Sequence, residues 1–93
     1  MGAITLTLNR EHLGKIVRLD RLTILDLPAG VFKQGEILMC FNNSDDFTTL
    51  VSHIPCSYRS ATSNHKTHFE VPPRAVFSLI FVDDNIVVYT VGL

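Results

Sequence analysis

The sequence predicts a small all-β domain, an antiparallel sandwich or jelly-roll-like fold of about eight short strands. The dominant hydrophobic period along the chain is two residues, which is typical of strands and not of helices. Turn signals recur about every ten residues, a spacing typical of sandwiches, jelly rolls and small barrels. The chain has 93 residues, 46% of them hydrophobic and 18% charged, which fits one folded domain over residues 1–93.

The predicted strands are runs rich in apolar and β-branched residues. They cover 3–8, 15–19, 22–27, 36–41, 47–51, 67–71, 75–82 and 86–91. The one helical candidate is the single turn 9–14, with Asn9 as the N-cap and Gly14 as the C-cap. Pro28 then ends the third strand.

Two of the connections have the composition of hairpin turns. Residues 42–46, Asn-Asn-Ser-Asp-Asp, favour a turn, so 36–51 is predicted to be a hairpin. Residues 83–85, Asp-Asp-Asn, join the last two strands in the clearest hairpin of the chain. Paired aspartates in such positions are explained by turn chemistry, without a catalytic or calcium-binding role.

Several predicted strands are apolar on both faces, namely 36–41, 75–82 and 86–91. In an isolated sandwich one face of each strand should be polar. Either the sheet closes tightly on itself or one face packs against another subunit, and we expect the second for at least one sheet. The expected contact residues on this face are Val76, Ile80 and Val82, with Arg59 and Arg74 as charges at the rim.

The segment 53–68 raises the question of a metal site. His53 and Cys56 form one pair of potential zinc ligands, and His65 and His68 form another. In a strand, however, residues three apart point to opposite faces, which works against convergence of the four side chains. A polar connection between two strands is the favoured interpretation, and we expect neither a metal nor a cofactor.

Other function classes find little support in the composition. The net charge of −1 gives no general attraction to nucleic acid or anionic membrane, and no apolar run is long enough to span a bilayer. No nucleophile, phosphate-binding or dinucleotide-binding motif occurs, so the chain is not expected to be an enzyme. Tyr58 and Arg59 are the only plausible platform for a sugar or a protein contact in the 53–68 segment.

The order of several short motifs resembles the small β-modules of tailed-bacteriophage virions. They are 5–19 (TLTLNREHLGKIVRL), 24–28 (ILDLP), 32–35 (FKQG), 41–44 (FNNS), 74–80 (RAVFSLI) and 91–93 (VGL). The resemblance covers essentially the whole chain. It departs from the family at 53–57, where many such modules have a glycine-rich stretch. It also differs in the final strand, where many have tryptophan or another aromatic residue and this chain has Tyr89.

This resemblance implies a non-enzymatic structural protein of the virion, assembled in the host cytoplasm. The expected role is that of a head decoration or cement protein, which binds the major capsid protein or another virion protein at capsomer junctions. A homo-oligomer is expected, with a trimer as the first guess. The alternative is a tail-fibre or spike module that binds a receptor or carbohydrate.

Overall fold

The computed structural model describes residues 3–58, 66–84 and 86–92 and confirms a small all-β domain. Its strands are β1 (Ile4–Thr7), β2 (Ile16–Leu19), β3 (Thr23–Leu27), β4 (Ile37–Asn42), β5 (Thr48–Tyr58), β6 (Lys66–Val71), β7 (Val76–Asp83) and β8 (Ile86–Val91), with one 3₁₀ turn, η1 (Arg10–His12). Within these residues no helix has the length and apolar character needed to cross a bilayer.

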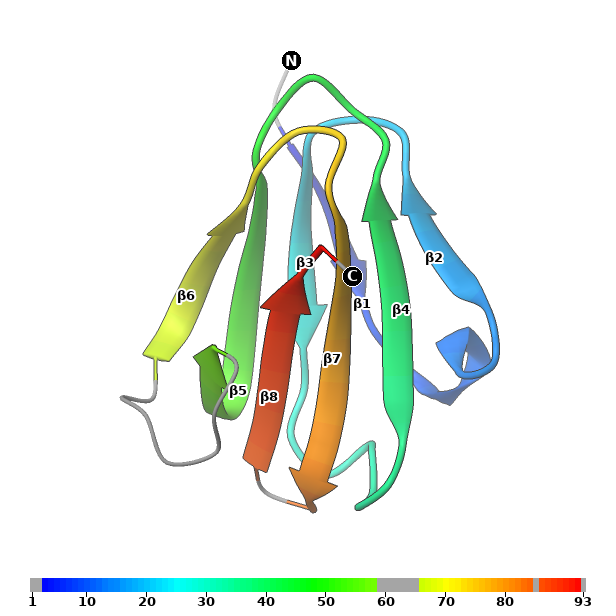
Figure 1. Cartoon of the computed structure of the whole chain (residues 1–93), viewed down its shortest axis with the longest axis vertical. Helices are drawn as coiled ribbons and strands as arrows, with labels where there is room; N and C mark the ends of the chain where they lie inside the picture. Colours follow the sequence, from blue (N-terminus) through cyan, green and yellow to red (C-terminus); the bar gives the residue numbers. More distant parts are fainter. Residues whose placement is uncertain (1–2, 59–65, 85, 93) are drawn as a thin grey trace.

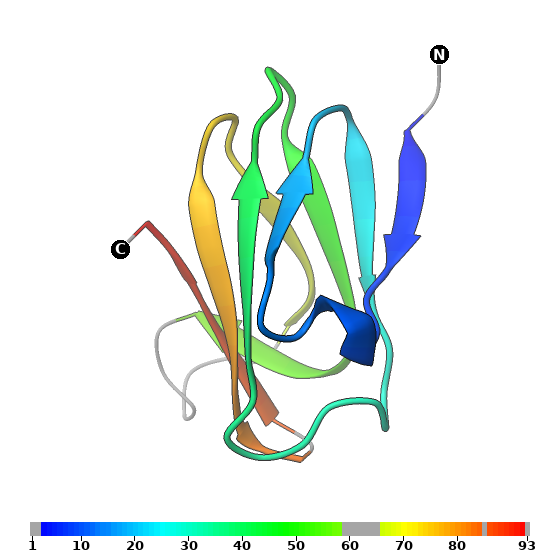
Figure 2. The same ribbon diagram turned by 90° about the vertical axis from the view of Figure 1, so that its right-hand side faces the viewer.

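The strands form one sheet that curls into two facing layers (Figures 1 and 2). One layer contains β1, β3, β5 and β6, and the other contains β8, β7, β4 and β2. The long strand β5 belongs to both. Its residues 48–52 pair with β3 and β6, whereas its last residues, 56–58, pair with β8, and Cys56 also pairs with Lys66 of β6. The register of β5 against β6 shifts between Val51 and Cys56, where the strand changes layer.

The pairing is mixed, although the sequence led us to expect antiparallel strands. β1 with β3, β3 with β5, β5 with β8, and β2 with β4 are parallel pairs. The predicted hairpin 36–51 is wrong, because β4 pairs with β2 and β7, while residues 48–52 of β5 lie in the opposite layer. Its turn residues form an arch between the layers. The predicted hairpin of the last two strands is confirmed as the antiparallel pair β7–β8.

Strand β5 also corrects the prediction for residues 53–68. Residues 53–58 continue the strand and are not a loop. The end of the predicted helical turn differs as well. Asn9 is its N-cap, as predicted, but the C-cap is Leu13, and Gly14 follows with φ of +77°. Glycine is favoured there because a left-handed backbone costs it nothing.

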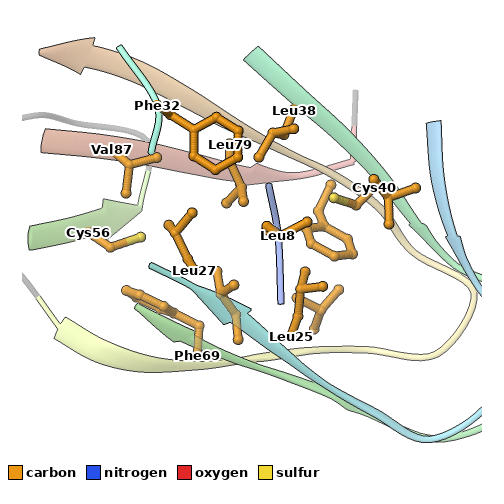
Figure 3. Packing of buried hydrophobic residues seen from close by; sticks show 14 of the residues in the cluster. Leu8, Leu25, Leu27, Phe32, Leu38, Cys40, Cys56, Phe69, Leu79 and Val87 are labelled. Atoms are coloured by element: carbon orange, nitrogen blue, oxygen red, sulfur yellow. The ribbon is translucent and has the colours of Figure 1, made fainter. Parts of the chain in front are cut away.

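The core lies between the two layers (Figure 3). Strand alternation sends one side of each strand inward, as for Leu25, Leu50, Phe77 and Leu79, which are fully buried. Phe32, from the connection between β3 and β4, is also buried, and its ring lies 5.0 Å from that of Phe81. Residues outside the strands therefore help to close the core.

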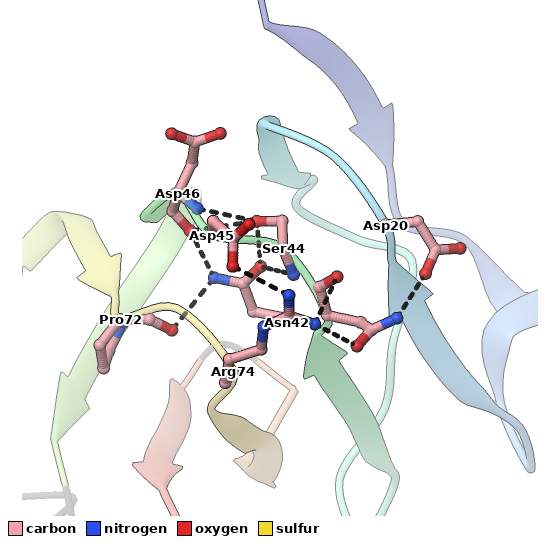
Figure 4. A network of polar contacts seen from close by, with 8 residues as sticks. Asp20, Asn42, Ser44, Asp45, Asp46, Pro72 and Arg74 are labelled. Atoms are coloured by element: carbon pink, nitrogen blue, oxygen red, sulfur yellow. Dashed lines mark hydrogen bonds and ion pairs between the residues drawn. The ribbon is translucent and has the colours of Figure 1, made fainter.

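A polar network joins three connections at one end of the sandwich (Figure 4). The fully buried Asn42 donates from Nδ2 to the carbonyl oxygens of Asp46 (2.9 Å) and Pro72 (3.0 Å). Asn43 donates to Asp20 at 2.9 Å, and Arg74 donates to the Asn43 side chain at 2.9 Å. The β2–β3, β4–β5 and β6–β7 connections are thus held together by side-chain hydrogen bonds.

Candidate docking surface

The two layers differ in the chemistry of their outer faces. In the β1-β3-β5-β6 layer the strand register aligns mostly polar side chains on the outside. They are Thr5, Thr7, Asp26, Thr49, His53, His68 and Glu70, interrupted by Ile24 and Val51. His53 Nε2 lies 2.7 Å from Asp26 Oδ1, so part of this face is also paired internally. Such a face is well suited to contact water.

The outer face of the β2-β4-β7-β8 layer is mostly apolar. Ile37 of β4 is opposite Ile80 of β7, which is opposite Val88 of β8. A second row runs from Ile16 to Met39 and ends on the hydroxyls of Ser78 and Thr90, which lie 2.9 Å apart. A third row runs from the exposed Arg18 of β2 to Phe41 and then Val76. The apolar face is defined here as Ile16, Ile37, Met39, Phe41, Val76 and Ile80. Val88, at the end of the first row, is 8% exposed and is therefore already buried within the domain.

The most exposed part of the apolar face lies where β2 and β4 meet. Ile16 is 69% exposed and Ile37 is 49% exposed. With Gly14, Lys15 and Met39 they line a shallow hollow of about 440 Å³. Because complete burial of an isoleucine side chain contributes about 1.5–3 kcal/mol, covering the exposed part of Ile16 alone would contribute about 1–2 kcal/mol.

The structure places the predicted contact residues in different locations. Val76 and Ile80 lie on the apolar face, and Val82, at the end of the same strand, is 39% exposed. Arg74 lies on the β6–β7 turn, where its guanidinium binds Asn43 and Asp45 in the polar network. Arg59 lies outside the described residues.

Tyr58 does not share the apolar face. It pairs in register with Tyr89, which is opposite the buried Leu79, so its side chain lies on the inner side of the strands. Its ring is 5.0 Å from the Tyr89 ring, which in turn lies 4.2 Å from Phe69. Tyr58 is nevertheless 42% exposed, at the margin of the sandwich.

Sequence reasoning missed the residues that make the apolar face most exposed, Ile16 and Ile37, together with Met39 and Phe41. The sequence did contain a signal for Ile37, Met39 and Phe41, because the run 36–41 is apolar on both faces. Ile16 precedes the buried Val17 in β2, and because successive side chains of a strand point to opposite faces, the Ile16 side chain points outward. Only the pairing of β2 with β4 places it beside Met39.

The candidate zinc ligands are not brought together. His53 is exposed on the polar outer face, whereas Cys56 is fully buried in the core. Burial raises the pKa of the Cys56 thiol to about 12, which opposes the thiolate that zinc requires. His68 is exposed on β6, and His65 lies outside the described residues. Within the described part of the chain no three His, Cys, Asp or Glu side chains gather as a metal site would need.

Comparisons of this chain with protein-family models, with curated proteins and with solved structures found no significant match.

Proposed function

We propose that this protein is a non-enzymatic structural component of a tailed-phage virion that attaches to a neighbouring virion protein through its apolar face. This proposal rests on the difference between the two outer faces, one of which is mostly polar and the other mostly apolar. A small domain that needed only to be soluble would be expected to keep both outer faces polar, and an exposed apolar patch commonly marks a protein contact.

The chemistry of the apolar face indicates what it would bind. Ile16, Ile37 and Met39 offer branched and flexible apolar surface around the hollow, with the cation of Lys15 at its border. The proposed partner surface is therefore apolar with an acidic rim, on the major capsid protein of an assembled head. A protein that binds only the assembled shell stabilises that shell by mass action.

The test is to add the purified protein to expanded heads, lacking it, of the phage that encodes the chain. Saturating binding and a rise in the melting temperature of the heads are expected. The double substitution Ile16→Glu with Ile37→Glu should weaken binding at least a hundredfold, because it removes about 2–3 kcal/mol of apolar burial and adds two desolvated charges. Both residues are exposed, so the variant is expected to fold.

A matched control is Thr49→Glu, which adds a charge to the opposite outer face. It should bind heads like the unmodified protein. Binding by the Ile16/Ile37 variant at unchanged affinity would rule out the apolar face, and failure of the unmodified protein to bind heads would rule out the decoration role.

A second candidate function is a receptor- or carbohydrate-binding module of a tail fibre or spike. The observation in its favour is the exposed side chain of Tyr58, whose ring packs against that of Tyr89, which in turn packs against Phe69. Binding of the unmodified protein to a glycan array or to host cells, abolished by Tyr58→Ala and accompanied by no binding to heads, would favour this alternative.

A further inference from the structure

Strand β1 ends one side of the sheet with an open edge. It pairs only with β3 in the described part of the chain, and in Figure 2 it lies at the right-hand margin of the molecule. An open edge presents unpaired backbone donors and acceptors, which makes it a template for a further strand.

The backbone groups on this edge can be identified from the printed hydrogen bonds. The N–H groups of Ile4 and Leu8 donate to β3 and the residues flanking it, at Leu22 (3.2 Å) and Asp26 (2.9 Å). Because successive residues of a strand point their N–H and C=O groups to opposite sides, those of Thr5 and Thr7 point away from β3. Two donors and two acceptors are thus aligned on the open edge.

The other open edges carry charges that discourage strand addition, and β1 does not. Strand β2 has Arg18 within it and Lys15 just before it, and β6 carries Glu70. Natural sheets commonly protect their edges with such charges or with proline. Residues 4–7, Ile-Thr-Leu-Thr, contain neither, and their β-branched and apolar side chains favour strand pairing.

We propose that β1 pairs antiparallel with β1 of a second copy of this chain around a two-fold axis at Leu6. In this register Thr5 of one copy faces Thr7 of the other, and the reverse. Each such pair exchanges two N–H···O=C bonds, so the four outward groups of each copy are all satisfied. A two-fold pair of this kind differs from the three-fold association expected from the resemblance.

The side chains of β1 fit the same register. Leu6, partly buried against the core, comes opposite Leu6 of the second copy on the inner side of the sheet. Ile4, which is 46% exposed, comes opposite Leu8 of the second copy and loses exposed apolar surface. Residues 4–7 carry no charge, and the charged side chains that line a hollow beside them, Arg18, Asp20 and Arg21, are of both signs. This inference does not depend on the proposed attachment to heads, because β1 lies in the other layer.

The first test is sedimentation equilibrium of the free protein up to millimolar concentration. A monomer–dimer equilibrium is expected. Thr5→Pro removes one outward N–H from each copy and leaves the bonds to β3 intact, since proline is tolerated on the solvent side of an edge strand. It should weaken the dimer about tenfold or more, because two of the four backbone bonds are lost.

Arg18→Pro is the matched control. The Leu19 carbonyl accepts from the N–H of Asn43, the residue just after β4, so the N–H of Arg18 points to the open edge of β2. This variant makes the same change on a different edge and should leave the dimer unchanged. A monomer at all concentrations, a trimer, or equal effects of the two proline variants would overturn the proposal.

A cross-linking test fixes the register. Leu6→Cys places two thiols across the axis, where facing Cα atoms are about 4.5 Å apart and a disulfide can form. Ile4→Cys is more exposed, but in this register its two copies are offset by four residues, about 14 Å, which is too far. Oxidation should cross-link Leu6→Cys at least tenfold faster than Ile4→Cys. Equal rates, or faster cross-linking at Ile4, would contradict the register.

Discussion

Replacing Asn42 by alanine should cost more stability than any exposed substitution near it. Its side chain is fully buried at the end of β4, yet its amide carries both a hydrogen-bond donor, Nδ2, and an acceptor, Oδ1. Nδ2 donates to the carbonyls of Asp46 and Pro72, and Oδ1 accepts from the Ser44 hydroxyl at 2.7 Å. These bonds hold the β4–β5 arch to the β6–β7 turn.

The magnitude follows from the number of bonds lost. Three well-formed hydrogen bonds contribute about 1 kcal/mol each, so Asn42→Ala should reduce the free energy of unfolding by about 3 kcal/mol. The total free energy of unfolding of a domain of this size is about 5–14 kcal/mol. The melting temperature should therefore fall by about 12–24 °C.

Urea unfolding followed by circular dichroism measures this change directly. The control is Asn43→Ala, which removes side-chain hydrogen bonds to Asp20 and Arg74 on the more exposed side of the same network. It should cost no more than about 1 kcal/mol, because bonds at the surface are replaced by water. A loss below 1 kcal/mol for Asn42→Ala, or equal losses for the two variants, would refute the reasoning.

Three other substitutions or conditions test further parts of the structure. Arg74 has φ of +62°, so Arg74→Gly should be more stable than Arg74→Ala by about 1 kcal/mol in thermal melts, and equal stabilities would contradict this. The buried Thr48 hydroxyl has no hydrogen-bond partner in the described structure, so Thr48→Val should raise the free energy of unfolding by about 1 kcal/mol, again measured with urea. Burial raises the pKa of the Cys40 and Cys56 thiols to about 12, above their value in the unfolded chain. The unfolded chain therefore releases these protons first, and stability should fall as the pH rises above about 9, a fall that replacing both cysteines by alanine should reduce.

Local sequence was sufficient to predict the strands because their signals are local. Alternation of apolar and polar residues marks β1, and the Asp-Asp-Asn turn specifies the β7–β8 pair, whose partners are neighbours in the chain. The cap at Asn9 depends on residues within one turn, since its side chain accepts from the Glu11 N–H at 2.8 Å.

The arch at residues 43–47 shows where such reasoning fails. Asn, Ser and Asp favour a turn equally well in a hairpin and between two layers. The choice depends on contacts distant in sequence, such as the bond from Asn42 to the Pro72 carbonyl and the pairing of β4 with β7. The assignment of 53–58 to a polar connection failed for a related reason, because the pairings of β5 with β3, β6 and β8, which extend the strand to Tyr58, join residues distant in sequence.

The sequence by itself determined that the chain forms an all-β domain, where most of its strands lie, and that several strands are apolar on both faces. Those properties follow from the alternation of apolar and polar residues and from the turn residues within short segments. Only the tertiary structure decided which strands are neighbours, and hence that Ile16 and Ile37 come together on an exposed face and that β1 is left with an open edge. Strand pairing joins residues far apart in the chain, so its outcome depends on the packing of the whole domain and not on any one segment.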